Sequence, residues 1–511
     1  MFAQVLSSTV LGIDAYIVKV EVHLEDQVPK FFMVGLPEGA VKESKSRVFS
    51  AIKNSGYFYK AKRTTINLAP ADIRKEGSAF DLPIAIGLLA GHGHVKHELL
   101  EEYILLGELA LDGNLRPIHG ALPISICAKS NDVRGIILPE KNAKEASLTD
   151  ELEIIPAKNL RDVVDFLNEE HSIPPYSIDI ESIFEEQSQY RIDFTDVKGQ
   201  EHVKRALEVA AAGGHNIIMI GPPGSGKTMI AKRFPTILPK MALEEALATT
   251  KIHSVAGLMP DGEGIIATRP FRSPHHTISD AALVGGGRIP RPGEVSLAHH
   301  GVLFLDELPE FKKNVLEVMR QPLENDTVTI SRAMVSLSYP ANFMLIAAMN
   351  PCPCGYATDP TNTCSCSVPQ IQKYMSKVSG PLLDRIDIHI EVPAVKFSEL
   401  SSDRKGEPSE SIRSRVQTAR EHQLERFQKR KDMFCNADME SKDIRKYCQV
   451  GEQSRSLLKA AINKLGLSAR AYDRILKVSR TIADLEGAED IRPEFISEAI
   501  QYRSLDRQLW A

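Results

Sequence analysis

The spacing of apolar and polar positions first indicates a mixed domain at the start of the chain. Up to about residue 165, short alternating or apolar runs typical of strands are mixed with longer runs of helical spacing. The first residues also read as a strand. This mixture predicts an α+β domain over residues 1–167. Further strands are expected at 16–24, 31–36 and 64–68, and helices at 40–54, 82–91 and 118–129.

The pattern then changes twice. Residues 168–190 are acidic, include two consecutive prolines and lack a sustained apolar repeat, which predicts a linker. From residue 191, short apolar strands at 216–220, 302–305 and 343–348 alternate with helices, which favours a parallel, doubly wound α/β sheet in a core spanning 191–395. The remainder, 396–511, is predicted to be a helical lid, from charged amphipathic stretches at 409–431, 441–447, 452–465, 469–485 and 493–502.

Composition narrows the class of protein. A chain of 511 residues is too long for one hydrophobic core, and 43% apolar with 25% charged residues is ordinary for a globular protein. No apolar run is long enough for a membrane span, and no basic stretch precedes the first apolar run, so a cytoplasmic enzyme without membrane association is expected. The net charge of −5 means that any DNA binding must use local patches or a channel formed by several subunits.

The clearest chemical motif is the octapeptide at 221–228, which follows an apolar strand and precedes a helical stretch. It matches the Walker A pattern, in which glycines let the backbone wrap around phosphate beside the positive end of a helix. Lys227 is expected to reach the β- and γ-phosphates of ATP, and Thr228 the Mg²⁺ ion. The structural alternative is a chance glycine turn. The candidate nucleotide-binding residues are Gly221, Pro222, Pro223, Gly224, Ser225, Gly226, Lys227 and Thr228.

Two later strand ends carry polar groups that suit hydrolysis. The run VLFLDE ends in Asp306, which can hold Mg²⁺, and Glu307, which can orient or deprotonate a water. The alternative is an acidic strand end that caps the next helix. The run FMLIAAMN ends in Asn350, whose amide can hold the attacking water, although Asn is also an ordinary strand-ending residue.

These motifs together resemble one ATPase family. DVKGQ at 196–200, GPPGSGKT, LFLDE, AAMNPCPCGY and GPLLDRIDIHIEVP resemble the magnesium-chelatase-like branch of AAA+ ATPases, and nearly the whole chain is similar to the bacterial YifB/ComM family. The resemblance implies an ATP-stabilised homohexamer in which Asn350 is sensor 1, Arg385 is an arginine finger inserted into the neighbouring subunit, and Arg470 is sensor 2. An arginine supplied in trans stabilises charge on the transferred phosphoryl group.

Each arginine has a structural alternative. For Arg385, the alternative is a salt bridge with Asp384 or Asp387. For Arg470, the alternative is a surface charge on a helix, and Arg474 competes for the sensor 2 role.

Candidate DNA contacts lie in two places. The run TVTISRAMVSLS at 327–338 is similar to a hairpin that projects into the pore of related ring motors, with Arg332 near its tip; an ordinary exposed hairpin is the alternative. Basic residues crowd between 42 and 75, including Lys60, Lys62 and Arg63, and suit contacts with a phosphate backbone unless they form a solvated charged face. A second insertion carries His275 and His276, which are expected to pack or cap.

Four of the seven cysteines fall within fifteen residues, in a loop at 352–366 that directly follows Asn350. Four thiolates can bind one tetrahedral Zn²⁺, although the CxC spacing is less common than CxxC. Free thiols and redox chemistry are the alternatives. The candidate zinc ligands are Cys352, Cys354, Cys364 and Cys366.

The N-terminal domain resembles the Lon-type protease fold without its catalytic dyad. Alignment of KEGSAFDL and RPIHGALP with the Lon motifs places Ala79 at the nucleophile position and Leu122 where the lysine should be. The domain is therefore predicted to be a binding platform. An insertion or deletion in the alignment would restore Ser78 as a nucleophile, which keeps an ATP-dependent protease as a rival.

The family resemblance implies a DNA motor. An ATP-driven ring that acts on single-stranded or branched DNA, with recombination proteins as further partners, would promote branch migration during natural transformation. The other rival is a chelatase motor that drives Mg²⁺ insertion into a porphyrin. A Lon-like N-terminal domain is not expected in the chelatase motor subunit and weighs against this rival.

Overall fold

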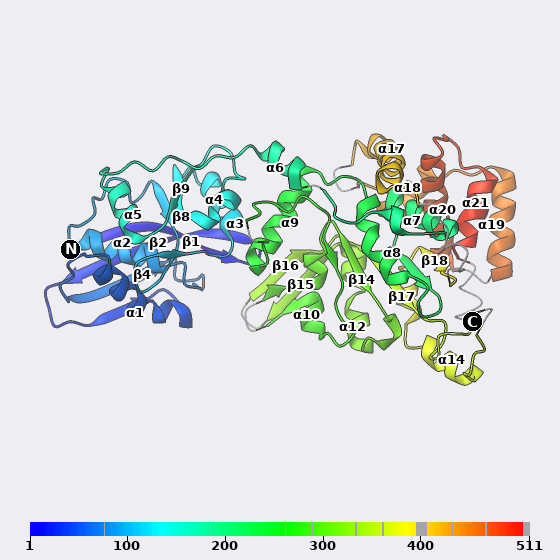
Figure 1. Cartoon of the computed structure of the whole chain (residues 1–511), viewed down its shortest axis with the longest axis horizontal. Coiled ribbons are helices and arrows are strands. Elements are labelled where there is room, and N and C mark those ends of the chain that lie inside the picture. The colour runs from blue at the N-terminus through cyan, green and yellow to red at the C-terminus, as the bar shows by residue number, and fades with distance from the viewer. Residues whose placement is uncertain are drawn as a thin grey trace. The chain divides into compact units, whose positions relative to one another are not determined.

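The computed structural model describes residues 1–75, 77–187, 189–260, 262–287, 290–332, 335–359, 362–394, 406–430, 433–465 and 468–503. Its contacts divide the chain into two compact units (Figure 1). The first comprises Met1–Ser188 and Leu243–Ala267, and the second comprises Gln189–Ala242 and Thr268–Ala511. Among the described residues, no helix is long and apolar enough to cross a membrane.

The first unit is built on a seven-stranded mixed sheet, in the order β3-β4-β2-β1-β5-β8-β9. The antiparallel pairs are β1 with β2 and β2 with β4, whereas the other neighbours are parallel. A small separate hairpin is formed by β6 and β7. The strands are β1 (Phe2–Leu11), β2 (Asp14–Glu25), β3 (Phe31–Val34), β4 (Arg63–Ala69), β5 (Tyr103–Leu105), β6 (Glu108–Leu109), β7 (Leu115–Arg116), β8 (Gly135–Pro139) and β9 (Glu153–Ala157).

Both faces of this sheet are covered by helices. Alternate residues of one strand enter different cores, since successive side chains point to opposite faces. Ile137, for example, belongs to the core with α1, α2 and α5, and its neighbour Ile136 to the core with α3 and α4. This arrangement confirms the predicted α+β domain. The helices are α1 (Gly39–Asn54), α2 (Asp81–Gly91), α3 (Ala121–Ser130), α4 (Glu140–Ala146), α5 (Leu160–Leu167) and, in the expected linker, α6 (Ile180–Gln187).

One part of the expected ATPase core belongs to the first unit instead. Helix α9 (Leu243–Ala256) contacts α3, and residues up to Ala267 belong with this unit. Ser254 donates to the buried carboxylate of Glu145, and Lys251 forms a 2.7 Å ion pair with Asp14. The contiguous core expected at 191–395 is therefore interrupted. This helix buries polar side chains that hydrogen-bond to residues far away in the chain. Its pattern of apolar residues therefore does not reveal which unit it packs against.

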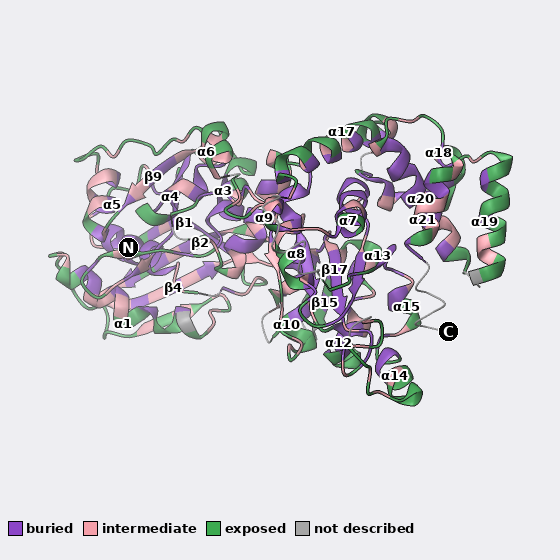
Figure 2. Cartoon of the chain, turned by 45° about the vertical axis from the view of Figure 1, so that its right-hand side comes forward, coloured by how far each residue is buried: buried purple, intermediate pink, exposed green. Residues whose placement is uncertain are grey.

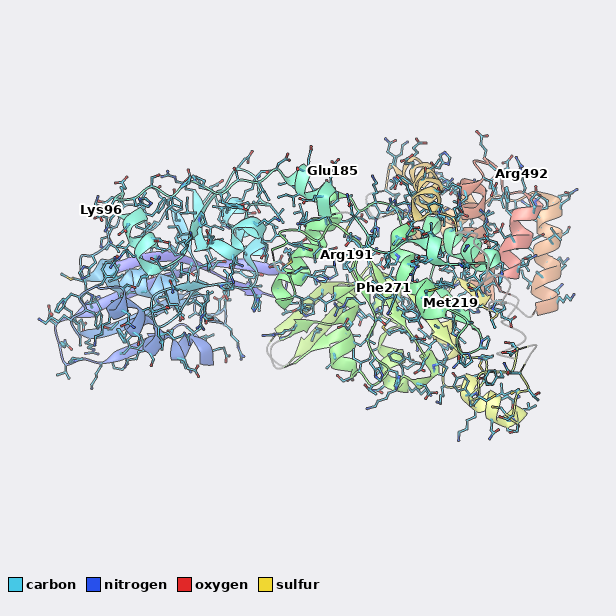
Figure 3. The ribbon with its side chains drawn as sticks, in the orientation of Figure 1. Lys96, Glu185, Arg191, Met219, Phe271 and Arg492 are labelled. Atoms are coloured by element: carbon cyan, nitrogen blue, oxygen red, sulfur yellow. The ribbon has the colours of Figure 1, made fainter. Side chains whose placement is uncertain are left out.

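The second unit contains a five-stranded parallel sheet in the order β11-β14-β17-β10-β18. All four residues of β10 are buried, Met219 among them, whereas Arg492 of the same unit is exposed (Figure 3). The strands are β10 (Ile217–Ile220), β11 (Phe271–Arg272), β14 (Val302–Leu305), β17 (Met344–Met349) and β18 (Ile388–Glu391). This confirms the predicted parallel α/β sheet, with the β10 loop at its carboxyl edge.

Helices and short ribbons surround this sheet. Two antiparallel pairs, β12 with β13 and β15 with β16, stand apart from it. The ribbons are β12 (Gly285–Gly286), β13 (Arg291–Pro292), β15 (Thr327–Arg332) and β16 (Val335–Pro340). The helices are η1 (Phe194–Asp196), α7 (Glu201–Gly213), α8 (Lys227–Arg233), η2 (Phe234–Ile237), α10 (Asp280–Val284), α11 (Glu294–Leu297), η3 (Leu308–Glu310), α12 (Lys313–Val318), α13 (Pro322–Asn325), α14 (Val368–Met375) and α15 (Gly380–Leu383).

The C-terminal part of the second unit is helical, as predicted. The long helices α17 and α20 place their buried residues in one core with α7 and the sheet (Figure 2). Arg205 of α7 also forms ion pairs with Glu486 at 2.8 Å and Glu498 at 3.0 Å. The helices are α17 (Ser409–Phe427), η4 (Asn436–Asp438), α18 (Ser441–Tyr447), α19 (Glu452–Leu465), α20 (Ala469–Leu485) and α21 (Pro493–Gln501).

Candidate functional site

The loop between β10 and α8 forms the centre of the candidate site. Gly226 has φ +89°, a left-handed conformation that glycine adopts without a steric penalty. A Cβ atom on Gly221 would lie 2.0 Å from the carbonyl oxygen of Val392, so the close approach of two backbones requires glycine there. The octapeptide therefore makes the strand-loop-helix turn that the Walker A pattern requires.

Lys227 extends its side chain back along this loop. Its Nζ donates to the carbonyl oxygens of Gly221 at 2.7 Å and Pro222 at 2.9 Å, and lies 3.4 Å from Oδ1 of Asn350. Burial lowers the pKa of Lys227, and the charge of Asp306 opposes this effect. The ammonium group therefore lies beside the end of β17. A negatively charged polyphosphate bound there would stabilise the charged form of Lys227, which burial disfavours.

The ends of β10, β17 and β14 bring the other candidate residues to the same edge, because neighbouring parallel strands end together. Thr228 Oγ1 donates to Asp306 Oδ2 at 2.7 Å. A hydroxyl and a carboxylate are the oxygen ligands that Mg²⁺ prefers, so this pair fits a magnesium ion shared with ATP phosphates.

Glu307 follows Asp306 but points to a different partner. Its φ of +53° places it in the left-handed region, which a non-glycine residue seldom adopts. Its carboxylate lies 3.3 Å from Nδ1 of His276, and its side chain is 57% exposed. The carboxylate is accessible to water, and His276 contacts the proposed base directly.

Arg385 is buried within its own chain, whereas an arginine finger that reaches a neighbouring subunit would be exposed. The side chain is 8% exposed and forms an ion pair with Glu324, a partner that sequence reasoning missed. It also donates to the carbonyl oxygen of Pro381. A role in a neighbouring subunit therefore requires this guanidinium to leave Glu324.

The two candidates for sensor 2 have different surroundings. Arg470 is 65% exposed and lies 4.0 Å from Asp384. Arg474 forms an ion pair with Asp387, a buried carboxylate whose oxygen also accepts from the backbone N–H of Asn216 at 3.1 Å. Burial alone would raise the pKa of Asp387, but Arg474, His215 and Lys477 together outweigh burial and lower that pKa. Arg474 is thus engaged in joining lid and sheet, while Arg470 is accessible.

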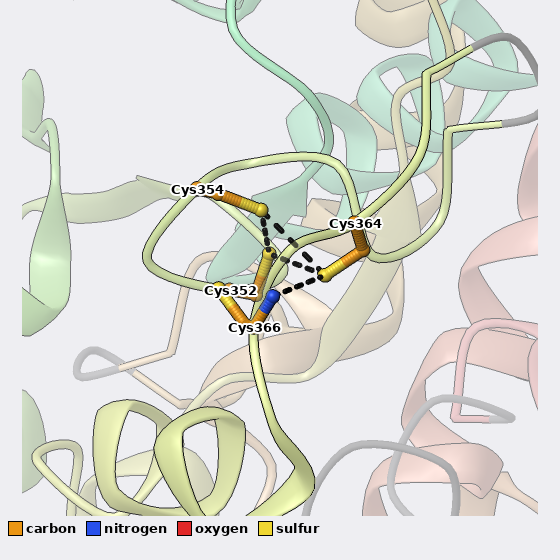
Figure 4. Close-up of side chains that lie close together, drawn as sticks. All are labelled: Cys352, Cys354, Cys364 and Cys366. Atoms are coloured by element: carbon orange, nitrogen blue, oxygen red, sulfur yellow. Dashed lines mark hydrogen bonds between the residues drawn. The ribbon is translucent and has the colours of Figure 1, made fainter.

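The four-cysteine loop gathers its sulfur atoms in one place (Figure 4). All four Sγ atoms lie within 4.8 Å of one another, and three of the pairs are 3.3, 3.5 and 3.7 Å apart. Four thiolates about 2.3 Å from one zinc ion would lie about 3.8 Å apart, so the donor set fits zinc. Backbone N–H groups of Tyr356 and Ser365 lower the pKa of Cys354 to about 5. The same loop packs on Pro223, since a Cβ on Gly355 would lie 2.5 Å from its Cδ.

Two of the predicted DNA contacts form ion pairs within the first unit. Lys62 pairs with Asp26 at 3.0 Å, and Arg63 lies 3.5 Å from Glu25, so both charges are partly neutralised. Lys60 is exposed. The backbone of Arg332 lies in β15, but its side chain and the tip at 333–334 fall outside the described residues.

Ser78, the serine next to the nucleophile position in the Lon-type alignment, has no lysine among its described hydrogen-bond partners. The hydroxyl of Ser78 donates to Glu108, and Leu122 is buried in α3. Lys75 is fully buried, and its Nζ donates to the carbonyl oxygens of Pro70 and Ile73. The arrangement of these described side chains therefore lacks the Ser–Lys pair that Lon-type peptidases use.

Sequence reasoning also missed a residue that braces the nucleotide loop. Gln200, the last residue of DVKGQ, donates from Nε2 to the carbonyl oxygens of Ser225 at 3.0 Å and Pro393 at 2.8 Å. The sequence marks this glutamine only as part of the family motif DVKGQ. A single side chain that donates to backbone oxygens produces no periodic pattern by which it could be recognised.

The parallel sheet carries the phosphate loop after β10 and the two adjacent carboxylates after β14, and an asparagine follows β17, the strand between them. Together with the helical lid, this arrangement defines an AAA+ P-loop ATPase. Family models agree over most of the chain. "Magnesium chelatase, subunit ChlI" matches residues 193–400, "Subunit ChlI of Mg-chelatase" matches 20–142, and "Magnesium chelatase, subunit ChlI C-terminal" matches 406–503.

Individual relatives narrow the class further. Competence protein ComM of Haemophilus influenzae is 46% identical over 99% of this chain and 98% of its own length. YifB of Salmonella typhimurium is 45% identical over 98% of this chain and 96% of its own length. The 67 kDa magnesium-chelatase subunit of Chlorobaculum tepidum is 28% identical over 31% of this chain and 23% of its own length. The chain therefore belongs to the ComM/YifB family of magnesium-chelatase-like AAA+ ATPases.

Proposed function

We propose that this protein is an ATP-driven ring motor that acts on single-stranded or branched DNA and promotes branch migration during recombination in natural transformation. The observation that carries the proposal is similarity to a competence protein along 99% of the chain, joined to a nucleotide site whose residues meet at one sheet edge. The motor would work in the cytoplasm with recombination proteins.

The nucleotide site supports the hydrolytic part of the proposal. Lys227 would contact the β- and γ-phosphates, Thr228 and Asp306 would hold Mg²⁺, and Asn350 beside Lys227 would help to position the attacking water. Glu307 would orient that water as the general base. Charge on the transferred phosphoryl group would be stabilised by Arg385 from a neighbouring subunit and by Arg470 from the lid.

The cysteine loop supports a structural zinc ion as a second cofactor. Four cysteine ligands leave no open position, which is typical of structural rather than catalytic sites. The ion would hold the loop that packs on Pro223, and so would stabilise the nucleotide loop from outside. Cys352, Cys354, Cys364 and Cys366 would be its ligands.

The comparisons and the structure bear differently on the two rival functions, the chelatase motor and the protease. The chelatase rival gains from the family model for residues 20–142, whose description is a chelatase subunit, so the N-terminal domain no longer weighs against it. The extent of similarity favours the DNA motor, because the chelatase relative matches only 31% of this chain. The protease rival is opposed by the contacts of Ser78.

The decisive experiment measures ATP hydrolysis and branch migration on forked and four-way DNA junctions. Wild-type protein is expected to hydrolyse ATP faster with single-stranded DNA and to move the junction. Lys227→Ala should abolish ATP binding or turnover, whereas Glu307→Gln should bind ATP, hydrolyse it at least about 100-fold more slowly and keep the ring assembled.

Other outcomes separate the rivals. Turnover stimulated by a porphyrin-binding partner and unchanged by DNA would support the chelatase function instead. Casein degradation that disappears in Ser78→Ala would support the protease. Junction movement by Lys227→Ala as fast as by wild type would refute an ATP-driven mechanism.

A further inference from the structure

Part of one face of the seven-stranded sheet lies outside both hydrophobic cores. The core with α3 and α4 includes residues of β1, β5, β8 and β9, and reaches β2 only at its turn end, at Ala15 and Ile17. None of the described residues of that core comes from β3 or β4. Residues of β4 alternate between buried and half-buried, since every second one, such as Ile66, packs in the core with α1 and α2. The remaining side chains of β2, β3 and β4 therefore form an open face.

Aromatic rings form a row across this open face. Residues that lie directly opposite each other in neighbouring strands point to the same side of a sheet. The strand register places four such residues in one row across β3, β4, β2 and β1: Phe32, Thr65, His23 and Phe2. Phe32 is 43% exposed, Phe2 is 58% exposed, and the imidazole of His23 is also exposed. With neighbouring strands about 4.8 Å apart, the two phenylalanines are about 14 Å apart.

The next row across the same strands is more polar. It consists of Val34, Asn67, Glu21 and Gln4. The amide Nδ2 of Asn67 donates to Oε2 of Glu21 at 2.9 Å. Amide and carboxylate groups beside exposed rings can form hydrogen bonds with the edges of bases that stack on those rings. Charged groups within the patch disfavour a protein partner, because the centre of a protein–protein interface is depleted of charged residues.

Positive charge gathers at the end of the face where β3 and β4 begin. That end carries four cations and two carboxylates: Lys30, Lys60, Lys62 and Arg63, and Glu25 and Asp26. Four cations minus two carboxylates leave a local surplus of two positive charges, on a chain whose net charge is −5. This surplus complements the phosphate groups of a nucleic acid.

Arg63 is held next to the aromatic row. Its guanidinium carbon lies 5.6 Å from the centroid of the Phe32 ring, and its Nη1 donates to Oε1 of Gln27 at 2.8 Å. A guanidinium held against a ring beside an exposed strand end can contact a phosphate while a base stacks on the ring.

We propose that the open face of β2, β3 and β4 is a stacking platform for single-stranded DNA, on which Phe32 and Phe2 each stack one unpaired base and Arg63 contacts a phosphate. Exposed rings on a sheet stack bases of any sequence, because every base has a π-face. This inference rests on the proposed function for its DNA ligand, and deepens it by naming a DNA contact in the N-terminal domain.

Ultraviolet crosslinking locates the contact directly. Full-length protein is irradiated with short oligo(dT) in the absence of ATP, and the crosslinked peptides are identified by mass spectrometry. Crosslinks are expected on peptides that contain Phe2, His23 or Phe32, because these rings would lie against thymine bases.

Binding measurements test the stacking. Phe32→Leu and Phe2→Leu should each weaken binding of oligo(dT) about tenfold, as measured by fluorescence anisotropy, whereas Phe32→Trp should bind at least as tightly as wild type. The double variant should lose about the product of the two factors, since the rings are about 14 Å apart. Tyr16→Leu is the matched control, because Tyr16 is an exposed aromatic residue of β2 whose side chain alternates to the opposite face.

Salt dependence tests the phosphate contact separately. Arg63→Gln should make the slope of log K against log salt concentration shallower by about 0.7, the contribution of one phosphate of a single strand. An unchanged slope would refute the role of Arg63. Duplex DNA should bind equally well to wild type and Phe32→Leu, because paired bases cannot stack on the ring.

Three results would overturn the platform. Binding of oligo(dT) as tight in Phe32→Leu and Phe2→Leu as in wild type would refute stacking. Loss of oligo(rU) binding in these variants, with oligo(dT) binding intact, would assign the face to RNA. A change of oligomeric state in sedimentation, with oligo(dT) binding intact, would make the face a contact between subunits.

Failure of the proposed function has a different signature. If wild-type protein neither binds oligo(dT) nor changes its ATP turnover when oligo(dT) is added, the DNA motor and the platform both fail. If oligo(dT) stimulates turnover but crosslinks only to peptides without Phe2, His23 and Phe32, the platform alone fails.

Discussion

Thr228 Oγ1 and Asp306 Oδ2 are joined by a 2.7 Å hydrogen bond between residues that are 78 positions apart in the chain. This bond links the start of α8 to the end of β14, and it brings together the two oxygen donors that suit Mg²⁺.

The first prediction follows from this pair. If both residues hold one ion, Thr228→Val and Asp306→Asn should each lower the rate of Mg²⁺-dependent ATP hydrolysis, by about 100-fold or more for the carboxylate. The double variant should lose little beyond Asp306→Asn alone, because the two act as a unit. Steady-state kinetics over a Mg²⁺ titration measures this, and full additivity would argue against a shared ion.

The second prediction concerns Arg385. Arg385→Ala should fold and bind ATP but lose hydrolysis, and mixing it with Lys227→Ala should restore part of the activity if the finger acts in a neighbouring subunit. Glu324→Gln is the matched control, since it removes the charge that Arg385 pairs with in this chain and should retain turnover. Equal loss of activity in both variants, without rescue on mixing, would mean that the ion pair is structural.

The third prediction separates the two lid arginines. Arg470→Ala should reduce hydrolysis with little change in stability, because its side chain is 65% exposed. Arg474→Ala should destabilise the protein by about 3–5 kcal/mol, because it removes the guanidinium that is paired with the buried carboxylate of Asp387. Urea unfolding and ATPase assays on both proteins measure this contrast. The opposite pattern would assign sensor 2 to Arg474.

The fourth prediction tests the cysteine cluster by metal analysis. Purified protein should contain about one zinc ion per chain, and Cys354→Ser or Cys364→Ser should abolish it and lower Tm by several degrees. Cys127→Ser is the control, because this cysteine is not in the cluster. If the protein contains no metal and mass spectrometry shows two disulfides among the four cysteines, redox chemistry would be supported instead. Four free thiols would exclude both zinc binding and redox chemistry.

The fifth prediction is a loss of stability in acid that depends on His299. Burial, reinforced by the neighbouring His300, lowers the pKa of His299 to about 3 from 6.5. The unfolded chain therefore binds a proton that the folded chain does not between these values, so stability is complete above pH about 6.5 and falls as pH decreases toward 3, by up to about 1.4 kcal/mol per pH unit.

Unfolding of wild type and His299→Gln between pH 7.5 and 5 measures that loss, with the exposed His97→Gln as control. His299→Gln should show a weaker dependence on pH than either of the other two proteins. An identical dependence in all three would show that His299 does not govern it.

The sequence by itself determined the elements and the chemistry of the nucleotide loop. Strands β10, β14 and β17 and the lid helices follow from local periodicity, because a buried strand or an amphipathic helix must show its own pattern of apolar residues. The glycines, Lys227 and Thr228 are recognisable for the same reason, since one continuous turn supplies the whole phosphate-binding motif. Much of the fold and of the nucleotide site was therefore predictable.

Only the tertiary structure decided which distant side chains pair. The assignment of α9 to the first unit, the pairing of Arg385 with Glu324 rather than Asp384 or Asp387, and the contact of His276 with Glu307 all join residues far apart in the chain. Ion pairs and buried hydrogen bonds depend on which elements pack together, and a polar residue shows no periodicity that names its partner. The same reason explains why the sequence did not show that two charges of the crowded basic segment are partly neutralised, Lys62 by Asp26 and Arg63 by Glu25.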